Sequence, residues 1–119
     1  MGLQKWLPCR YLVSYTWPVN PVPIQKDEDG NTRYNVSKKT DRPVIATLSH
    51  DGKWVSATYT RETGNLWTNP ERSCQHADPA VNLGPGETKT LELKTFILKG
   101  NLGRLLVLVD LEMAKPDQK

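Results

Sequence analysis

The 119-residue sequence has little of several features that would narrow its class. It contains two cysteines and one phenylalanine, and its long apolar run, 102–111, is interrupted by Arg104 and Asp110 and is too short to span a bilayer. The first twenty residues lack the apolar stretch and the small-residue cleavage site of a secretory signal peptide. The sequence therefore predicts a protein without a membrane span that stays in the cytoplasm.

Charge of one sign is not gathered anywhere along the chain. The net charge is +3, and the sixteen Lys and Arg residues are scattered singly or in pairs, with Lys38 and Lys39 the densest point. Nucleic-acid binding normally needs a basic stripe, so no nucleic-acid partner is expected. Four Trp and four Tyr provide large apolar groups to bury, which predicts a folded domain although the mean hydropathy is −0.58.

The two cysteines, Cys9 and Cys74, leave three states open: a disulfide bridge, two buried thiols, or one of each kind. In a chain without an export signal, reduced thiols are the favoured state.

The clearest structural pattern is a β-hairpin between Arg42 and Arg61. Two apolar-alternating segments flank Asp51-Gly52, a dipeptide typical of two-residue turns with positive φ. That turn predicts a register in which the apolar residues of both strands share one face. The predicted cross-strand pairs are Leu48 with Val55, Ala46 with Ala57, and Val44 with Tyr59.

A second unit begins with a glycine-rich turn at 83–87 and continues into a strand over 88–100. Leu91, Leu93 and Ile97 recur at period two and predict the buried face, while Glu92 and Lys94 lie on the other face. After this strand, Asn101 is a suitable N-cap for a helix over 102–113. The same residues also fit a buried strand, and periodicity alone does not decide between helix and strand.

The rest of the chain predicts short strands separated by turns. One strand is expected within 6–17 and another at 32–36, with prolines and polar turn residues between them. The expected fold is all-β: an antiparallel β-sandwich with one short C-terminal helix. We expect a single domain over 1–119, which is either free-standing or the terminal piece of a larger protein.

The segment from Leu66 to Pro79 is the richest in chemical groups, and its two prolines predict an ordered loop. Within it, Trp67 and Cys74 are expected to be buried. Cys74, His76 and Asp78 have metal-ligand side chains, but a structural zinc site needs a fourth ligand that the sequence does not supply. A Cys74 nucleophile with His76 as base lacks an orienting group. The favoured interpretation is that His76 and Asp78 bond the loop's own backbone.

Trp54 is expected on the polar face of the hairpin, together with serine and threonine hydroxyls. A flat aromatic side chain beside hydroxyls and amides is the arrangement that holds a sugar ring. Core packing explains a tryptophan equally well, so both alternatives stay open. No catalytic residue, metal ligand or cofactor is assigned. The expected saccharide-binding residues are Trp54, Trp67, Asn69, Arg72, His76 and Asp78.

The order of hairpin, W-x-N-P-x-x-x-C-x-H-x-D-P, L-x-P-G-E-T, long strand and leucine-rich segment resembles the C-terminal part of bacterial galactose-mutarotase-like supersandwich proteins. The resemblance covers about residues 42–106 and implies a carbohydrate-related context. A mutarotase uses a His and a Glu across a concave sheet, and here only His50 and His76 are available. The resemblance thus implies a non-catalytic sandwich module that binds a saccharide, or else a fragment or subunit of a carbohydrate-active enzyme. A supersandwich is much larger, so a homo-oligomer or a missing partner domain is also expected.

Overall fold

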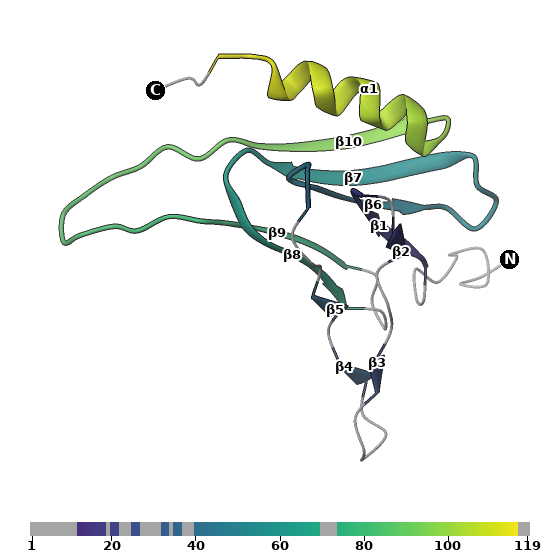
Figure 1. Cartoon of the computed structure of the whole chain (residues 1–119), viewed down its shortest axis with the longest axis horizontal. Helices are drawn as coiled ribbons and strands as arrows, with labels where there is room; N and C mark the ends of the chain where they lie inside the picture. The colour runs from purple at the N-terminus through teal and green to yellow at the C-terminus, as the bar shows by residue number, and fades with distance from the viewer. Residues whose placement is uncertain are drawn as a thin grey trace, which may run out of the picture.

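The computed structural model describes residues 12–18, 20–21, 25–26, 32–33, 35–36, 40–69 and 74–116 (Figure 1). All strand pairs in this part of the chain are antiparallel, and the only helix in it follows the last strand. The five-stranded sheet has the order β10-β7-β6-β1-β2, formed by Leu93–Lys99, Trp54–Thr60, Val44–Leu48, Ser14–Thr16 and Asn20–Pro21.

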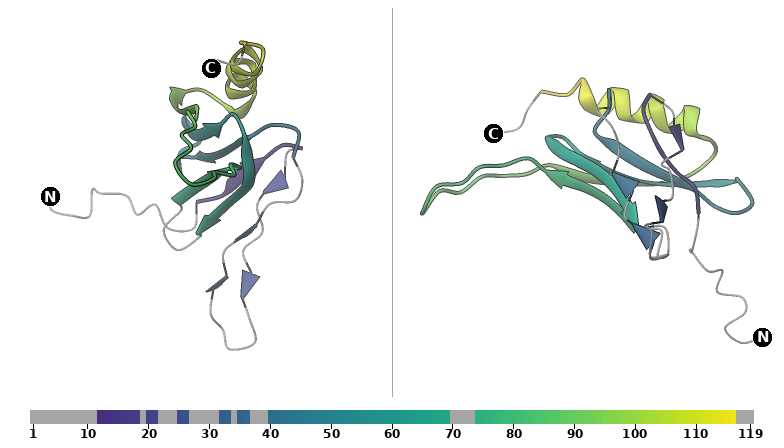
Figure 2. Two further views of the ribbon diagram at one scale, coloured as in Figure 1. Left: turned by 90° about the vertical axis from the view of Figure 1, so that its left-hand side faces the viewer. Right: turned by 60° about the horizontal axis from the view of Figure 1, so that its bottom comes forward.

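The three-stranded sheet has the order β5-β8-β9, formed by Asn35–Val36, Thr63–Asn69 and Cys74–Pro79. The remaining two strands, β3 (Gln25–Lys26) and β4 (Thr32–Arg33), pair with each other. Helix α1 spans Leu102–Met113 and lies alongside β10 (Figures 1 and 2). An all-β antiparallel sandwich with one short C-terminal helix is therefore confirmed.

The main core lies between the five-stranded sheet and α1. Leu105 and Val109 are fully buried on the inner stripe of the helix. They pack on the sheet face that carries Val55, Ala57 and Tyr59 of β7, as the alternation of side chains along a strand dictates. Burial of the Tyr59 side chain raises the pKa of its phenol above the ordinary value.

The predicted hairpin register is confirmed in full: Leu48 lies opposite Val55, Ala46 opposite Ala57, and Val44 opposite Tyr59. The prediction of a two-residue turn at Asp51-Gly52 is wrong, because the connection between the strands comprises the four residues His50–Lys53. Gly52 has a φ of 71° and donates its N–H to the carbonyl of Ser49, 2.9 Å away. The Asp51 carboxylate accepts hydrogen bonds from the Ser49 hydroxyl and the Lys53 N–H, which lower its pKa below the usual value.

The predicted buried face of β10 is also wrong. Leu93 and Ile97 are 66% and 72% exposed, and Leu91, just before the strand, is exposed as well. The buried residue is Phe96, which is on the same face as Lys94 and contributes to the core beneath α1. The reason is that the helix covers this face, so the side of the strand with fewer aliphatic residues is turned inward.

Residues 102–113 form a helix, which settles the choice between helix and strand. The Asn101 side chain accepts a hydrogen bond from the N–H of Arg104 at 3.0 Å and is the N-cap, as predicted. In the last turn of the helix, Asp110 accepts two hydrogen bonds from the Arg42 guanidinium at 2.7 and 3.1 Å, which lower the pKa of that carboxyl.

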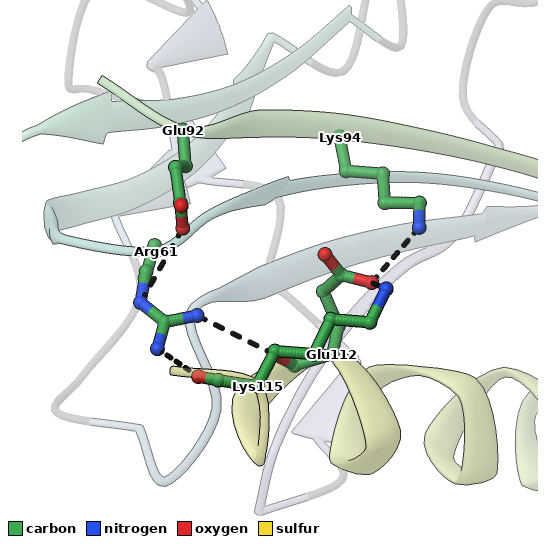
Figure 3. A network of polar contacts seen from close by, with 5 residues as sticks. All are labelled: Arg61, Glu92, Lys94, Glu112 and Lys115. Atoms are coloured by element: carbon green, nitrogen blue, oxygen red, sulfur yellow. Dashed lines mark hydrogen bonds and ion pairs between the residues drawn. The ribbon is translucent and has the colours of Figure 1, made fainter. Parts of the chain in front are cut away.

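The C-terminal end of α1 is fixed to the sheet by a polar network (Figure 3). Arg61, which follows β7, donates to the backbone carbonyls of Glu112 and Lys115 at the C-terminal end of the helix, and it forms an ion pair with Glu92 at 3.4 Å. Glu112 accepts from Lys94 at 2.8 Å and from Lys115 at 3.1 Å. These contacts hold the helix end over the start of β10.

The smaller sheet packs on the other face of the five-stranded sheet (Figure 2). Leu66 of β8 and Ala77 of β9 turn inward and are buried with Ile45 of β6. Beside this small apolar cluster, Gln75 and the hydroxyls of the main sheet form hydrogen bonds. The connection 80–92 between β9 and β10 extends away from the sandwich as two limbs, and most of its side chains are exposed (Figure 1).

Candidate functional site

The chemically rich segment is a β-hairpin and not the predicted loop. Its two strands, β8 and β9, are paired so that Trp67 lies opposite His76, Asn65 opposite Asp78, and Asn69 opposite Cys74. Alternate positions of a strand point to opposite faces, so these six positions share the outer face of the smaller sheet. Extended backbone in this segment is compatible with both prolines, since Pro79 ends β9 and Pro70 falls after β8.

On this outer face, Trp67, His76, Asp78 and Cys74 form one contact cluster. The Trp67 and His76 rings are stacked, with centroids 3.6 Å apart and an interplanar angle of 7°. The indole Nε1 of Trp67 donates to the Asp78 carboxylate at 2.7 Å. The Sγ of Cys74 lies 3.2 Å from the Nε2 of His76. The side chains therefore bond one another, and the expected bonds from His76 and Asp78 to the local backbone stay a prediction.

This cluster has the features of a structural element. His76 covers one face of the Trp67 indole, so that face is not open to a sugar ring. Trp67 and Cys74 are half-buried, less than predicted, and Cys74 is a free thiol. Within the described residues, no group of three His, Cys, Asp or Glu side chains is placed to hold a metal ion.

Trp54 lies elsewhere, at the start of β7. Among the three tryptophans that the structure describes, it is the exposed one, at 48%, whereas Trp17 is buried and Trp67 half-buried. It lines a shallow groove of about 240 Å³ together with Leu48, Ile97 and neighbouring residues. The hydroxyl-bearing residues Thr47, Ser49 and Ser56 also line this groove.

Gln75 holds one side of the groove in place, although the sequence reasoning did not assign it a role. Its amide nitrogen donates to the Thr47 hydroxyl at 2.9 Å and to the Ser56 carbonyl at 2.7 Å. Its amide oxygen accepts from the Thr58 hydroxyl at 2.8 Å. The sequence could have predicted this orientation. Gln75 is next to His76, and neighbouring strand residues point to opposite faces, so Gln75 faces inward when His76 faces outward.

The structure does not bring the six predicted binding residues into one site. Trp67, His76 and Asp78 are together on the outer face of the smaller sheet, and Asn69 is paired with Cys74 in the strand register. Trp54 belongs to a different sheet and groove. Arg72 lies outside the described residues. The predicted strand residues before 12, including Cys9, also lie outside them.

A second hollow, of about 260 Å³, lies beside the polar network of Figure 3 and is lined by Tyr59, Arg61, Glu112 and neighbouring residues. Its charged groups are paired with one another, so we assign it to the attachment of α1. The helix among the described residues is too short to cross a membrane. Comparison with protein-family models, with curated proteins and with solved structures finds no match to this chain. The relationship to mutarotase-like proteins therefore remains a prediction from the sequence.

Proposed function

We propose that the protein is a non-catalytic β-sandwich module that binds a saccharide in the Trp54 groove. The observation that supports this most is the half-exposed indole of Trp54 in a groove whose exposed surface is almost entirely apolar. A sugar ring has an apolar C–H face that stacks on an indole, and in a shallow groove its hydroxyl groups stay in contact with water.

The size of the groove limits the ligand. Its volume of about 240 Å³ is below the roughly 300–1,000 Å³ of pockets that enclose whole ligands. Such a groove holds one ring or the end of a chain, with the rest of the glycan outside. The walls are strands braced by Gln75, so the groove exists before the ligand arrives and little ordering entropy is lost on binding.

This proposal relocates the site expected from the sequence. Trp67 is replaced by Trp54 as the stacking residue because His76 covers one Trp67 face. The cluster of Trp67, His76, Asp78 and Cys74 then stiffens β8 and β9, on which Gln75 is held. The non-catalytic part of the proposal rests on the groove itself, because its lining residues in the described part of the chain carry no carboxylate or imidazole to act as acid or base.

The test is a tryptophan-fluorescence titration with neutral, acidic and sulfated glycans, guided by a glycan array. We expect saturable quenching that Trp54→Ala abolishes. The matched control is Trp67→Phe, which keeps an aromatic ring beside His76 and should retain binding. The proposal fails if no glycan binds, or if Trp67→Phe and not Trp54→Ala removes binding. Mutarotation or glycoside cleavage by the purified protein would refute the non-catalytic part.

A further inference from the structure

The strand β10 has an outer edge that no other strand of the described residues covers, because β10 is the last strand of its sheet. A seven-residue edge strand offers a row of backbone donors and acceptors to another strand. Proteins usually protect such edges with charged side chains or bulges. The middle of β10 does not have this protection.

The charge that would guard the edge is turned away from it. The Lys94 ammonium lies 2.8 Å from the Glu112 carboxylate and 5.5 Å from the centre of the Phe96 ring. Both contacts hold it on the face beneath α1. The residues on the other face of the strand near its middle are Leu93, Thr95 and Ile97, which are exposed and uncharged.

The hydrogen bonds to β7 identify which backbone groups of β10 point outward. Arg61 donates to the carbonyl of Glu92, and Gly100 donates to the carbonyl of Lys53, at the two ends of the ladder. In an antiparallel pair, residues that exchange hydrogen bonds alternate with residues that do not. Even-numbered residues from 92 to 100 thus face β7, and Leu93, Thr95 and Ile97 direct their N–H and C=O groups outward.

These features are self-complementary, and we propose that the chain forms a two-fold symmetric dimer through antiparallel pairing of β10 with β10 of a second copy. With the two-fold axis at Thr95, each Leu93 lies opposite Ile97 of the other copy and the two Thr95 residues face each other. Every residue of these three pairs has its backbone groups directed outward. The aliphatic pairs cover exposed apolar surface, and no lysine lies opposite another lysine.

Helix α1 supports the same axis. It is apolar on most of its surface, yet Val107 and Leu111 are each 60% exposed. They lie on one stripe with Arg104, whose guanidinium donates to the carbonyl of Lys99 at 3.4 Å, and this contact puts the stripe on the β10 side. Pairing of β10 would bring the two helices together, antiparallel, along this stripe.

Apolar exposure is concentrated on these two elements, which favours a second copy as the occupant. Five of the nine exposed large apolar side chains in the described part lie on β10 and α1, namely Leu93, Ile97, Val107, Leu111 and Met113. Pairing about a single two-fold axis buries the sheet edge and the helix stripe together, as a closed symmetric interface requires. The dimer goes beyond saccharide binding and does not depend on it.

The first experiment is sedimentation velocity of the full chain over a concentration series. We expect a species of twice the 13.5 kDa of one chain. Thr95→Lys places two ammonium groups opposite each other and should weaken the dimer about fivefold. Val13→Lys, an exposed apolar position away from β10, is the matched control and should leave the dimer unchanged. Thr95 does not line the Trp54 groove but Ile97 does, so saccharide binding is measured on each variant as well.

A second experiment tests the register by oxidation. Residues that exchange hydrogen bonds across an antiparallel pair have Cα atoms about 5.5 Å apart, which suits a disulfide. Thr95→Cys should therefore form a covalent dimer that the unmodified chain does not form, whereas Leu93→Cys should not. A chain that remains monomeric up to about 1 mM would overturn the proposal, because a specific β10–β10 interface should be populated at that concentration. A covalent dimer from Leu93→Cys alone would also overturn it.

Discussion

Gln75 makes the most direct prediction about what holds the two sheets together. Its side-chain amide forms three hydrogen bonds to the five-stranded sheet, at 2.7, 2.8 and 2.9 Å. A net contribution of about 0.5–1.5 kcal/mol per bond, reduced because water reaches this half-buried residue, gives about 2 kcal/mol for the set. Gln75→Met keeps the volume and removes all three bonds, so it should lower the free energy of unfolding by about that amount.

The assay is urea unfolding followed by circular dichroism and tryptophan fluorescence. With a urea slope of about 2 kcal/mol per molar, the midpoint should fall by about 1 M. The exposed residue Asn82 on the limbs provides a control, and Asn82→Ala should shift the midpoint by less than the experimental error. A Gln75→Met midpoint equal to that of the unmodified chain would refute the view that this amide joins the sheets.

Gln75→Glu distinguishes the role of the amide oxygen, which accepts a hydrogen bond, from that of the amide nitrogen, which donates two. The new carboxylate still accepts from Thr58, but its second oxygen faces the Ser56 carbonyl, which cannot donate. The charged form is therefore disfavoured in the folded state and the folded pKa is raised. A raised pKa of an acid means that stability relative to the unmodified chain is lowest at neutral pH and recovers as pH falls through the folded value. A variant whose deficit does not change with pH would contradict this geometry.

Two further changes test the turn and the helix attachment. Gly52→Val should lower the free energy of unfolding by about 1–2 kcal/mol. The cause is backbone strain, because Gly52 has a φ of 71° and an added Cβ would meet no atom within 4 Å. Thermal melting of this variant and of the milder Gly52→Asn tests the prediction, and an unchanged melting temperature of Gly52→Val would count against it. Hydrogen bonds from Lys94 and Lys115 lower the pKa of Glu112, so its contribution is present above the unfolded value of about 4.3 and is lost as pH falls through the folded value. Stability curves between neutral and acid pH should therefore steepen at the acid end, and Glu112→Gln should flatten that slope.

The sequence predicted the elements whose signals are local. Asp51-Gly52 and the alternation beside it determine the register of β6 and β7, although the turn itself takes four residues because Ser49 and Lys53 bond to the Asp51 carboxylate. Asn101 specifies where α1 begins, since its side chain satisfies a backbone N–H of the first turn. In both cases, residues within a few positions of one another supply the whole interaction.

The errors concern choices that depend on distant residues. Either face of β10 has enough apolar side chains to be buried, and the choice is made by α1, which lies after the strand in sequence and packs on Phe96. Likewise, the cluster around Trp67 looked like a loop because its prolines stand out, while the pairing of Trp67 with His76 is visible only when β8 and β9 are aligned. Short-range patterns do not contain this information.

The smaller sheet covers only part of the five-stranded sheet, and this leaves the Trp54 groove and the Ile97 end of the β10 edge exposed. Along the face of β7 that it covers, Thr60 is buried, Thr58 is half-buried, and Ser56 and Trp54 are exposed. Gln75 is the last inward-facing residue of β9 at this end, and its bonds to Thr47 and Ser56 determine where coverage stops. Beyond that point, the backbone of the five-stranded sheet is hydrogen-bonded between its own strands. The apolar side chains of Trp54 and Ile97, however, remain exposed to water. Covering such apolar side chains gains free energy, and for this reason we place the proposed saccharide site at the start of β7 and the end of β10, beyond Gln75.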